Sequence, residues 1–384
     1  MARVLVAMSG GVDSAVAAAL LVDAGHDVTG VHLKLADTPI EDQVPGHGCC
    51  TLDDAQDARR AAQVLDIPFY VWDMSEAFDR EVQQPFAQAY AAGITPNPCI
   101  TCNERVKYAA LLDRAVSMGF DALATGHHAR LRRDGEPVIE PGPDTRLHRS
   151  ADPRKDQSYV LYVATSEQLA RTLLPVGEVS KDEVRTIAAE RGLRVADKPD
   201  SYDVCFIPDG DTAGYLEHHL PAAPGRIVDL DGTALGEHDG IWRFTVGQRR
   251  GLGLQNTPTS TDGRVERRFV VDVDASTSTV RTGPRDALAC RWAELAAPTW
   301  TTGAPPAGPV RVQVRAHGST VPARVTSGDD GAVRLELDEP VHGLALGQAA
   351  VVYDPTNEVC LGGGRVARAD RPAGLPVFSS QPGV

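Results

Sequence analysis

A glycine-rich turn at residues 9–14, SGGVDS, has the composition of a phosphate-binding site. Gly10 and Gly11 let the backbone approach an anion without a Cβ in the way. Ser14 is expected to open a helix, whose N-terminal amides and dipole favour negative charge. The turn lacks the lysine of a Walker A loop and carries Asp13 instead. An acidic residue beside phosphate makes most sense with a divalent cation between them, so we expect Asp13 to face Mg²⁺ through a pyrophosphate group.

Three cysteines have positions that suit sulfur or metal chemistry. Cys99 and Cys102 form a CxxC pair after two prolines, and we expect both on a loop just before a helix. The amides that open this helix would lower a nearby thiol pKa toward the reactive thiolate. A lone CxxC equally suits a metal knuckle or a redox pair. Cys205 follows an Asp-rich stretch and has no neighbour to complete a four-thiol zinc site.

The remaining cysteines are given no role. Cys49 and Cys50 lie at a predicted loop-to-helix junction, and Cys290 and Cys360 are expected to be small buried hydrophobic residues.

Residues 1–207 alternate strand and helix patterns, which is typical of a parallel sheet covered on both faces. Helices are expected from Thr51, with Asp54 completing a capping box, and from Ser180, with Glu183 in the same relation. This predicts a doubly wound α/β fold with ligands beyond the carboxyl ends of the strands. The predicted strands are 4–8, 26–35, 67–74 and 121–129.

The pattern changes after Pro208. A polar helix at 212–220 leads into Gly- and Asp-rich turns between short strands. Period-two segments then predict a small antiparallel β-barrel, and the Pro-, Ala- and Ser-rich tail after Gly364 is expected to fray. We therefore predict three domains, with bounds 1–207, 208–285 and 286–384. The predicted barrel strands are 310–317, 321–327, 332–340 and 349–354.

Composition bounds the class of protein. With 384 residues, 42% hydrophobic and 23% charged, the chain is typical of a globular protein. It shows no apolar run of membrane-spanning length and no signal peptide, so a cytoplasmic location is expected. Seven cysteines then argue against a disulfide scaffold. The net charge of −14 disfavours nucleic-acid binding without excluding a local basic face.

The turn at 9–14 resembles the SGGxDS loop of the N-type ATP pyrophosphatases, which split ATP into AMP and pyrophosphate to adenylate an oxygen atom. Further strings along almost the whole chain resemble the tRNA-specific 2-thiouridylase family, whose members replace the O2 of the wobble uridine with sulfur. They are AMSGGVDSAV, GVHLKL, TPNPC with CN, ATGHHAR, KDQSYVL, SYDVCFI, FTVGQRRGLG and GQAAVVYD.

The resemblance implies a fold, a chemistry and a set of site residues. The fold would be adenine nucleotide alpha-hydrolase-like, with a small central domain and a barrel that help to grip tRNA. Cys102 would be the catalytic nucleophile and Cys205 the persulfide carrier, one thiol presenting sulfur and the other releasing it by disulfide formation. The implied ATP-binding residues are Ala7, Met8, Ser9, Gly10, Gly11, Val12, Asp13, Ser14, Leu33 and Gly126. The implied tRNA-binding residues are Asn97, Pro98, Cys99, His127, Lys155, Asp156, Gln157 and Gln348.

The same resemblance implies partners. The enzyme would take the anticodon stem-loop of tRNA, with the target base splayed out of its stack, and would receive sulfur from a cysteine desulfurase or a relay protein. No helix suggests a dimer, so a monomer is expected.

The chain departs from the family pattern at Cys99, where many members have Asp. Three thiolates, Cys99, Cys102 and Cys205, would leave one iron of a [4Fe-4S] cluster open to hydrosulfide. A cluster mechanism therefore stands beside the persulfide route as an alternative.

Other interpretations also stay open. The loop alone fits an ATP pyrophosphatase that activates a substrate for amination, although amination needs neither thiol. The cysteines alone fit a non-catalytic iron-sulfur or zinc protein that binds RNA. Among single residues, Leu33 fits a core position, Lys155 and Asp156 a solvated turn, and Gln348 a polar residue at a strand end.

Overall fold

A computed structural model gives the arrangement of the chain. It describes residues 1–35, 52–200, 204–207, 209–254, 266–327, 332–370 and 378–379. Cys49, Cys50 and Thr51, which the sequence analysis singled out, lie outside these ranges.

The N-terminal part is built on a five-stranded sheet in the order β3-β2-β1-β4-β8, and every neighbouring pair is parallel. The four predicted strands are confirmed. The first has the predicted length and is shifted by one residue, while the other three are shorter than predicted, above all the last, which ends at Thr125 rather than Ala129. The strands are β1 (Arg3–Ala7), β2 (Asp27–Lys34), β3 (Phe69–Asp73), β4 (Ala122–Thr125) and β8 (Thr172–Leu173).

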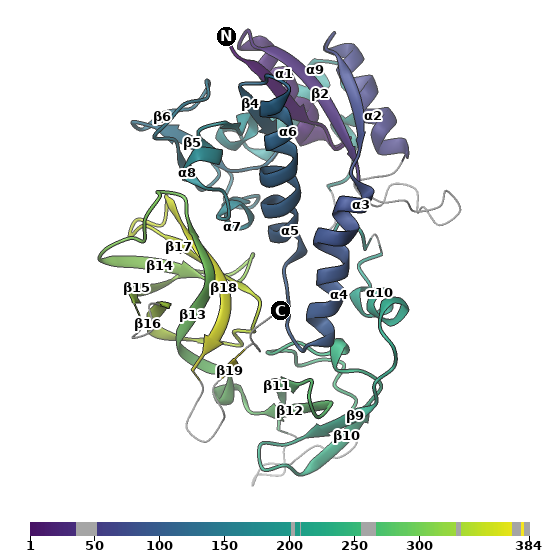
Figure 1. Cartoon of the computed structure of the whole chain (residues 1–384), viewed down its shortest axis with the longest axis vertical. Helices are drawn as coiled ribbons and strands as arrows, with labels where there is room; N and C mark the ends of the chain where they lie inside the picture. Colours follow the sequence, from purple (N-terminus) through teal and green to yellow (C-terminus); the bar gives the residue numbers. More distant parts are fainter. Residues whose placement is uncertain are drawn as a thin grey trace.

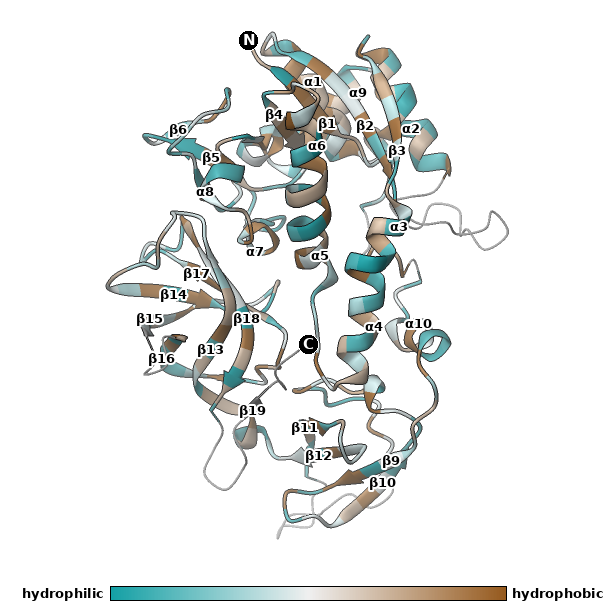
Figure 2. Ribbon diagram, viewed as in Figure 1, coloured by the Kyte–Doolittle hydropathy of each residue, from teal (hydrophilic) through white to brown (hydrophobic). Residues whose placement is uncertain are grey.

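Both faces of the sheet are buried at its central strands β2, β1 and β4, as the doubly wound fold requires, whereas the edge strand β3 is largely exposed. On β1, Val4 and Val6 pack in one apolar cluster with α1 and α9, while Leu5 points into another. Figure 1 shows helices on either side of the sheet, and Figure 2 shows apolar residues concentrated on β1, with a mainly hydrophilic α2 outside. The longer helices here are α1 (Val12–Asp23), α2 (Leu52–Val64), α4 (Gln84–Ala91) and α9 (Lys181–Glu190).

Shorter elements complete this part. The helices are α3 (Ser75–Phe78), α5 (Pro98–Thr101), α6 (Leu112–Ser117), α7 (Ser158–Leu161) and α8 (Ser166–Leu169). Two π-helical segments lie between them, η2 (Asp79–Gln83) and η3 (Cys102–Leu111). A small sheet is formed by β5 (Arg130–Arg133), β6 (Glu136–Pro137) and β7 (Arg146–His148).

Helix starts follow the local sequence. Ser180 caps α9 in a complete capping box with Glu183, as predicted. Helix α1 begins at Val12 with Gly11 as its N-cap residue, two residues before the predicted start at Ser14. The loop is therefore shorter than expected, and Asp13 already belongs to the first helical turn.

The middle of the chain forms α10 (Thr212–His219), as predicted, and a four-stranded sheet in the order β10-β9-β12-β11. Its strands are β9 (Gly225–Val228), β10 (Ala234–His238), β11 (Phe269–Asp274) and β12 (Thr279–Gly283).

The C-terminal strands close into a six-stranded antiparallel barrel, because the long β13 and β18 pair with each other at the ends of the strand order. The barrel strands are β13 (Ala289–Trp300), β14 (Pro309–Gln313), β15 (Val321–Ser327), β16 (Val333–His342), β17 (Ala349–Tyr353) and β18 (Cys360–Ala369), with β19 (Phe378–Ser379) outside. The predicted fraying after Gly364 is wrong for residues 365–369, because Val366 and Ala369 are buried and paired with β13.

The barrel shares an apolar core with the N-terminal part. Leu161 of α7 packs in one cluster with Val351 and Tyr353 of β17. The Arg149 guanidinium stacks over the Tyr353 ring at 3.7 Å from its centroid and donates to Gln313 and Asn357. Figure 1 shows α7 next to β17. The barrel is thus held against the parallel-sheet part by side-chain packing and hydrogen bonds.

Candidate active site

The phosphate loop, residues 9–14, follows β1, and residues 126–128 follow β4. These two strands are neighbours in the sheet, at the point where the strand order reverses. In open α/β sheets the crevice at this point is the usual ligand site.

Two glycines are required by the packing of the loop. Gly10 has φ +83°, and a Cβ there would lie 2.3 Å from the carbonyl oxygen of Asp54. A Cβ on Gly126 would lie 2.5 Å from the backbone nitrogen of Ser14. Gly11 differs, since its nearest neighbour would be the Ser9 hydroxyl at 3.5 Å. The protein itself leaves room at Gly11, which is the side from which a phosphate can approach.

We therefore expect Gly11→Ala to fold normally and to weaken ATP binding by roughly tenfold or more, because the methyl group occupies the approach of the phosphate. Gly10→Ala, in contrast, should lower the melting temperature as well. Calorimetric titration with ATP and a thermal melt separate the two effects. Unchanged ATP affinity in Gly11→Ala would contradict this placement of the phosphate.

The serines hold the loop in shape. Ser14 Oγ accepts a hydrogen bond from Ser9 N at 3.1 Å and donates to the Gly11 carbonyl at 3.0 Å, and the Ser9 hydroxyl lies 3.3 Å from it. These hydrogen bonds fix the two ends of the loop against each other.

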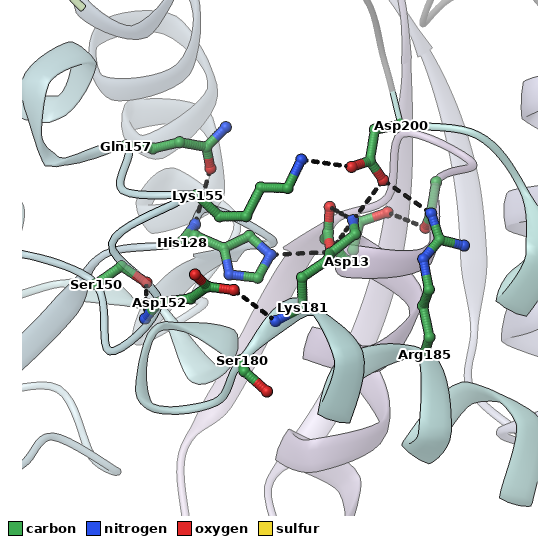
Figure 3. Close-up of polar contacts among 12 residues, drawn as sticks. Asp13, His128, Ser150, Asp152, Lys155, Gln157, Ser180, Lys181, Arg185 and Asp200 are labelled. Carbon is green, nitrogen blue, oxygen red and sulfur yellow. Dashed lines mark hydrogen bonds and ion pairs between the residues drawn. The ribbon is translucent and has the colours of Figure 1, made fainter. Parts of the chain in front are cut away.

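A lysine from a helix far along the sequence contacts the phosphate loop. Lys181, the first residue of α9, has a side chain only 8% exposed, and its Nζ lies 2.7 Å from both carboxylate oxygens of Asp13 and 2.9 Å from Asp200. His128 Nε2 donates to Asp13 at 3.0 Å. Burial alone would raise the pKa of Asp13, but hydrogen bonds from His128 and Lys181 lower it overall. Figure 3 shows these side chains converging on Asp13.

A second lysine holds the other end of the loop. Lys198 Nζ donates to the Gly10 carbonyl at 3.0 Å and to Asp54 and Asp57 at 2.8 Å. The sequence analysis missed both Lys181 and Lys198. The capping box at Ser180 located the start of α9, yet nothing local indicates that its first residue reaches Asp13, 168 positions away.

Asp200 is surrounded by cations. It accepts from Lys155 at 2.6 Å, from Lys181 at 2.9 Å and from Arg185 at 3.0 Å. Burial alone would raise the pKa of Asp200, while hydrogen bonds from Lys155 and Lys181 lower it to about 2. Its carboxylate therefore stabilises the fold above its ordinary pKa, and this contribution is lost as the pH falls through about 2.

Asp200→Asn should accordingly lower stability at neutral pH and flatten its fall between about pH 4 and pH 2. Urea unfolding at a series of pH values measures this directly. Asp27→Asn, at an exposed ion pair with Arg3, is a suitable control. Parallel pH curves for Asp200→Asn and the unmodified protein would rule out this role.

The residues 155–157, implied as tRNA contacts, all have polar partners within the protein. Lys155 pairs with Asp200, and Gln157 Oε1 accepts from the backbone of His128 at 2.8 Å. Asp156, with a side chain 10% exposed, pairs with Arg149 at 2.6 Å. The solvated-turn interpretation is therefore wrong for Asp156, whose carboxylate is used inside the protein.

His127 also has partners within the protein. Its Nδ1 lies 2.7 Å from the Thr125 hydroxyl, and Lys107 Nζ donates to its Nε2 at 3.2 Å. Burial, with Lys107 adding to it, holds the pKa of His127 well below its ordinary value. Both ring nitrogens therefore have partners within the protein.

The other implied residues are placed by their strands. Leu33 lies in the apolar core, and Met8 and Val12 are buried, whereas Ala7 is half-buried at the end of β1. Gln348 is half-buried just before β17, where its side chain accepts weakly from Ala345 N at 3.4 Å. None of these contacts conflicts with a ligand role.

The CxxC pair is helical. Asn97 caps α5 by accepting from the amides of Cys99 and Ile100, Cys99 lies within α5, and Cys102 begins η3. The predicted loop is thus wrong, because an N-cap asparagine followed by a proline is itself a helix start.

The predicted fall in thiol pKa is also wrong for Cys102. Its side chain lies a full turn inside the helix, away from the unpaired amides, and it is 8% exposed in the apolar core. Burial raises its pKa to about 12, although the positive charge of Lys107 opposes the rise. A raised pKa disfavours the thiolate form of Cys102, which is the nucleophilic form.

The third cysteine lies near this pair. Cys205 packs against the same apolar cluster as Cys102, and Cys99 and Cys205 both add to the rise in the Cys102 pKa. Within the described ranges, however, no three His, Cys, Asp or Glu side chains gather closely enough to hold a metal ion. The three thiols are neighbours without the arrangement of cluster ligands. Cys290 and Cys360 are buried in the barrel region, as predicted.

No helix in the described part of the chain is long and apolar enough to cross a membrane.

Comparisons with known proteins cover nearly the whole chain. Protein-family models match residues 2–209 (tRNA methyl transferase HUP domain), 213–284 (tRNA methyl transferase PRC-barrel domain) and 293–366 (Aminomethyltransferase beta-barrel domain). The tRNA-specific 2-thiouridylase MnmA of Salinispora tropica is 53% identical over 370 residues, spanning 95% of this chain and 99% of that protein. Its counterpart from Acidothermus cellulolyticus is 54% identical over 375 residues, spanning 97% and 99%.

Among solved structures, a 4-thiouridine synthetase in complex with RNA and bound ATP is 17% identical, with a TM-score of 0.35 over 56% of this chain and 50% of that chain. So weak a likeness supports no conclusion about this chain.

Fold and site together define a HUP-domain enzyme with a phosphate-binding loop. The relatives narrow the class further: the chain belongs to the tRNA-specific 2-thiouridylase family, as its sequence predicted.

Proposed function

We propose that this enzyme uses ATP to activate the O2 of the wobble uridine in tRNA and then replaces that oxygen with sulfur. One observation carries the proposal: the helix that bears Cys99 and Cys102 is linked to the phosphate loop through the residues that follow β4. Lys107 of η3 contacts His127, and the adjacent Gly126 packs against the phosphate loop at Ser14. ATP chemistry and sulfur chemistry can therefore act on one base.

The loop and its lysines would bind the phosphates of ATP. Lys181 now neutralises Asp13, and we expect its ammonium to turn to the pyrophosphate when the nucleotide binds. Asp13 would then face Mg²⁺, which supplies further charge neutralisation when it is bound with the nucleotide. The adenylated oxygen leaves as part of AMP, which a uracil oxygen alone cannot do.

The sulfur step would use Cys205 and Cys102. The terminal sulfur of a Cys205 persulfide attacks C2, forming the C–S bond as the C–O bond to AMP breaks. The Cys102 thiolate then attacks Sγ of Cys205, which breaks the S–S bond and leaves the sulfur on the base. A Cys102–Cys205 disulfide remains, and two electrons from a thiol reductant reset it.

The cluster alternative has less support, since the described cysteines are not gathered as ligands. Anaerobic purification, an iron count and an absorption spectrum test it. An iron-free enzyme that thiolates tRNA at full rate would exclude it, whereas activity that depends on bound iron would replace the persulfide route.

Further parts of the proposal come from the sequence and its resemblance alone. They are the domain bounds 1–207, 208–285 and 286–384, a monomeric state and a cytoplasmic location, with a cysteine desulfurase or relay protein as sulfur donor.

Pyrophosphate release tests the first half of the reaction. With ATP and a sulfur source, unmodified tRNA with uridine at the wobble position should stimulate release, and the same tRNA with wobble cytidine should not. Equal stimulation by both tRNAs would contradict the proposal.

A further inference from the structure

An arginine of the barrel forms polar contacts with the thiol helix, residues 98–111. Arg365 of β18 donates its Nη2 to Glu104 Oε2 at 2.6 Å and to the Thr101 hydroxyl at 3.3 Å. Thr101 directly precedes Cys102, and Glu104 follows it by two positions. The ion pair is about two-thirds buried on both sides. Arg365 thus contacts residues on both sides of Cys102 in the sequence.

Contacts on another side of the helix complete a ring. Asn103, 1% exposed, donates to the Val160 carbonyl of α7 at 2.9 Å. The Tyr159 hydroxyl of the same short helix donates to the Ala349 carbonyl of β17 at 2.8 Å. Ala349 is paired in register with Arg365. These contacts form a closed chain: the thiol helix contacts α7, α7 contacts β17, β17 pairs with β18, and Arg365 of β18 contacts the thiol helix.

The helix has other means to fold locally. Asn97 caps it, and Val106 and Leu111 bury its apolar face in the core. Arg365 therefore adds orientation rather than helix formation. A guanidinium can reach two acceptors in a fixed geometry, whereas a lysine ammonium is a compact point charge.

We propose that Arg365 is a positioning residue for sulfur transfer, through which the barrel sets the place of Cys102 relative to the activated carbon. This inference rests on the proposed function. A misplacement of about 1 Å costs on the order of 10²-fold in rate when reacting atoms must meet. Arg365 contacts Thr101 and Glu104, whereas the link from this helix toward the phosphate loop runs through Lys107 and His127, so we expect the ATP step to change much less than sulfur transfer.

The experiment uses four test variants: Arg365→Met, Arg365→Lys, Glu104→Gln, and the double variant that combines Arg365→Met with Glu104→Gln. Arg368→Met is the control. Arg368 lies on the same strand and pairs at 2.9 Å with Glu294, another residue of the barrel, so it is a matched control. Three quantities are measured: formation of 2-thiouridine, tRNA-stimulated pyrophosphate release, and the rate of Cys102 alkylation by iodoacetamide, followed by mass spectrometry of the peptide.

In Arg365→Met we expect 2-thiouridine formation to fall roughly 10- to 100-fold, pyrophosphate release to stay near wild type and Cys102 to alkylate faster. Arg365→Lys should restore part of the rate. The double variant should resemble the more impaired single variant, because both changes break one contact. Arg368→Met should change none of the three quantities.

Wild-type thiolation in Arg365→Met would overturn the inference, and so would an equal loss of thiolation and pyrophosphate release in both arginine variants. If the proposed function is wrong, the unmodified enzyme itself makes no 2-thiouridine. That outcome differs from both results that would overturn the inference on Arg365. The alkylation rate reports the helix position even then.

Discussion

Cys205→Ala and Cys102→Ala are each expected to abolish 2-thiouridine formation while tRNA-stimulated pyrophosphate release continues. The physical reason is the division of the site: the thiols lie on and beside the helix that begins at Pro98, and in the proposed function the phosphates bind to the loop after β1 and to Lys181, which lies against Asp13. Removing a thiol stops sulfur transfer without removing any group that binds ATP. Mass spectrometry of tRNA nucleosides and a pyrophosphate assay on the same samples measure both halves.

Cys290→Ala is the control for these variants, because this thiol is buried in the barrel core and packs with a different apolar cluster. It should thiolate tRNA normally. Cys99→Ala separates the two sulfur routes, since the persulfide route keeps its activity and the cluster route loses it. Continued thiolation by Cys102→Ala or Cys205→Ala would show that the sulfur route is assigned to the wrong residues.

Lys181→Met is expected to lower pyrophosphate release by about 10²–10³-fold, the usual cost of removing one group that stabilises developing charge. It should also destabilise the protein by about 1–3 kcal/mol, because Asp13 and Asp200 lose a shared buried partner. Initial rates at saturating ATP and urea unfolding measure the two effects.

Arg154→Met is the matched control for Lys181→Met. Arg154 forms ion pairs with Asp152 and Asp182 beside the same helix start, but its side chain is 68% exposed. Asp152 keeps hydrogen bonds from the backbone amides of Arg154 and Lys181 in this variant, so we expect little loss of pyrophosphate release. Wild-type pyrophosphate release in Lys181→Met would show that the lysine serves the fold alone.

Local patterns predicted the parts of the fold that depend on local sequence. The apolar strands around the phosphate loop, the capping box at Ser180 and the glycines of the loop were all visible as short motifs. The loop prediction at Asn97 and Pro98 is wrong because a proline is equally compatible with a loop and with the first position of a helix, and here the Asn97 cap starts a helix.

The two strands that close the barrel, β13 and β18, could not be predicted from their sequences. Strand β18 contains Gly362, Gly363 and Gly364, which weaken a strand prediction. Their reason is three-dimensional, since a Cβ on Gly362 would lie 2.2 Å from the Thr299 carbonyl of β13. The glycines allow the contact that closes the barrel.

The missed site residues share one property: their partners are distant in sequence. Lys181 meets Asp13, Lys198 meets Gly10, and Arg365 meets Glu104, 261 positions away. Only the docking of whole elements brings these groups together. The burial that raises the Cys102 pKa arises in the same way, from packing that no local pattern around the CxxC pair reveals.

The central claim is that one chain couples ATP cleavage to sulfur insertion at the wobble uridine. The most direct test is mass spectrometry of the wobble nucleoside after incubation of the full-length enzyme with unmodified tRNA, sulfide or a persulfide donor, and ATP. The account predicts 2-thiouridine in an amount matched by AMP, and none when ATP is omitted. Unmodified uridine at that position in the complete mixture, or 2-thiouridine formed without ATP, would contradict it.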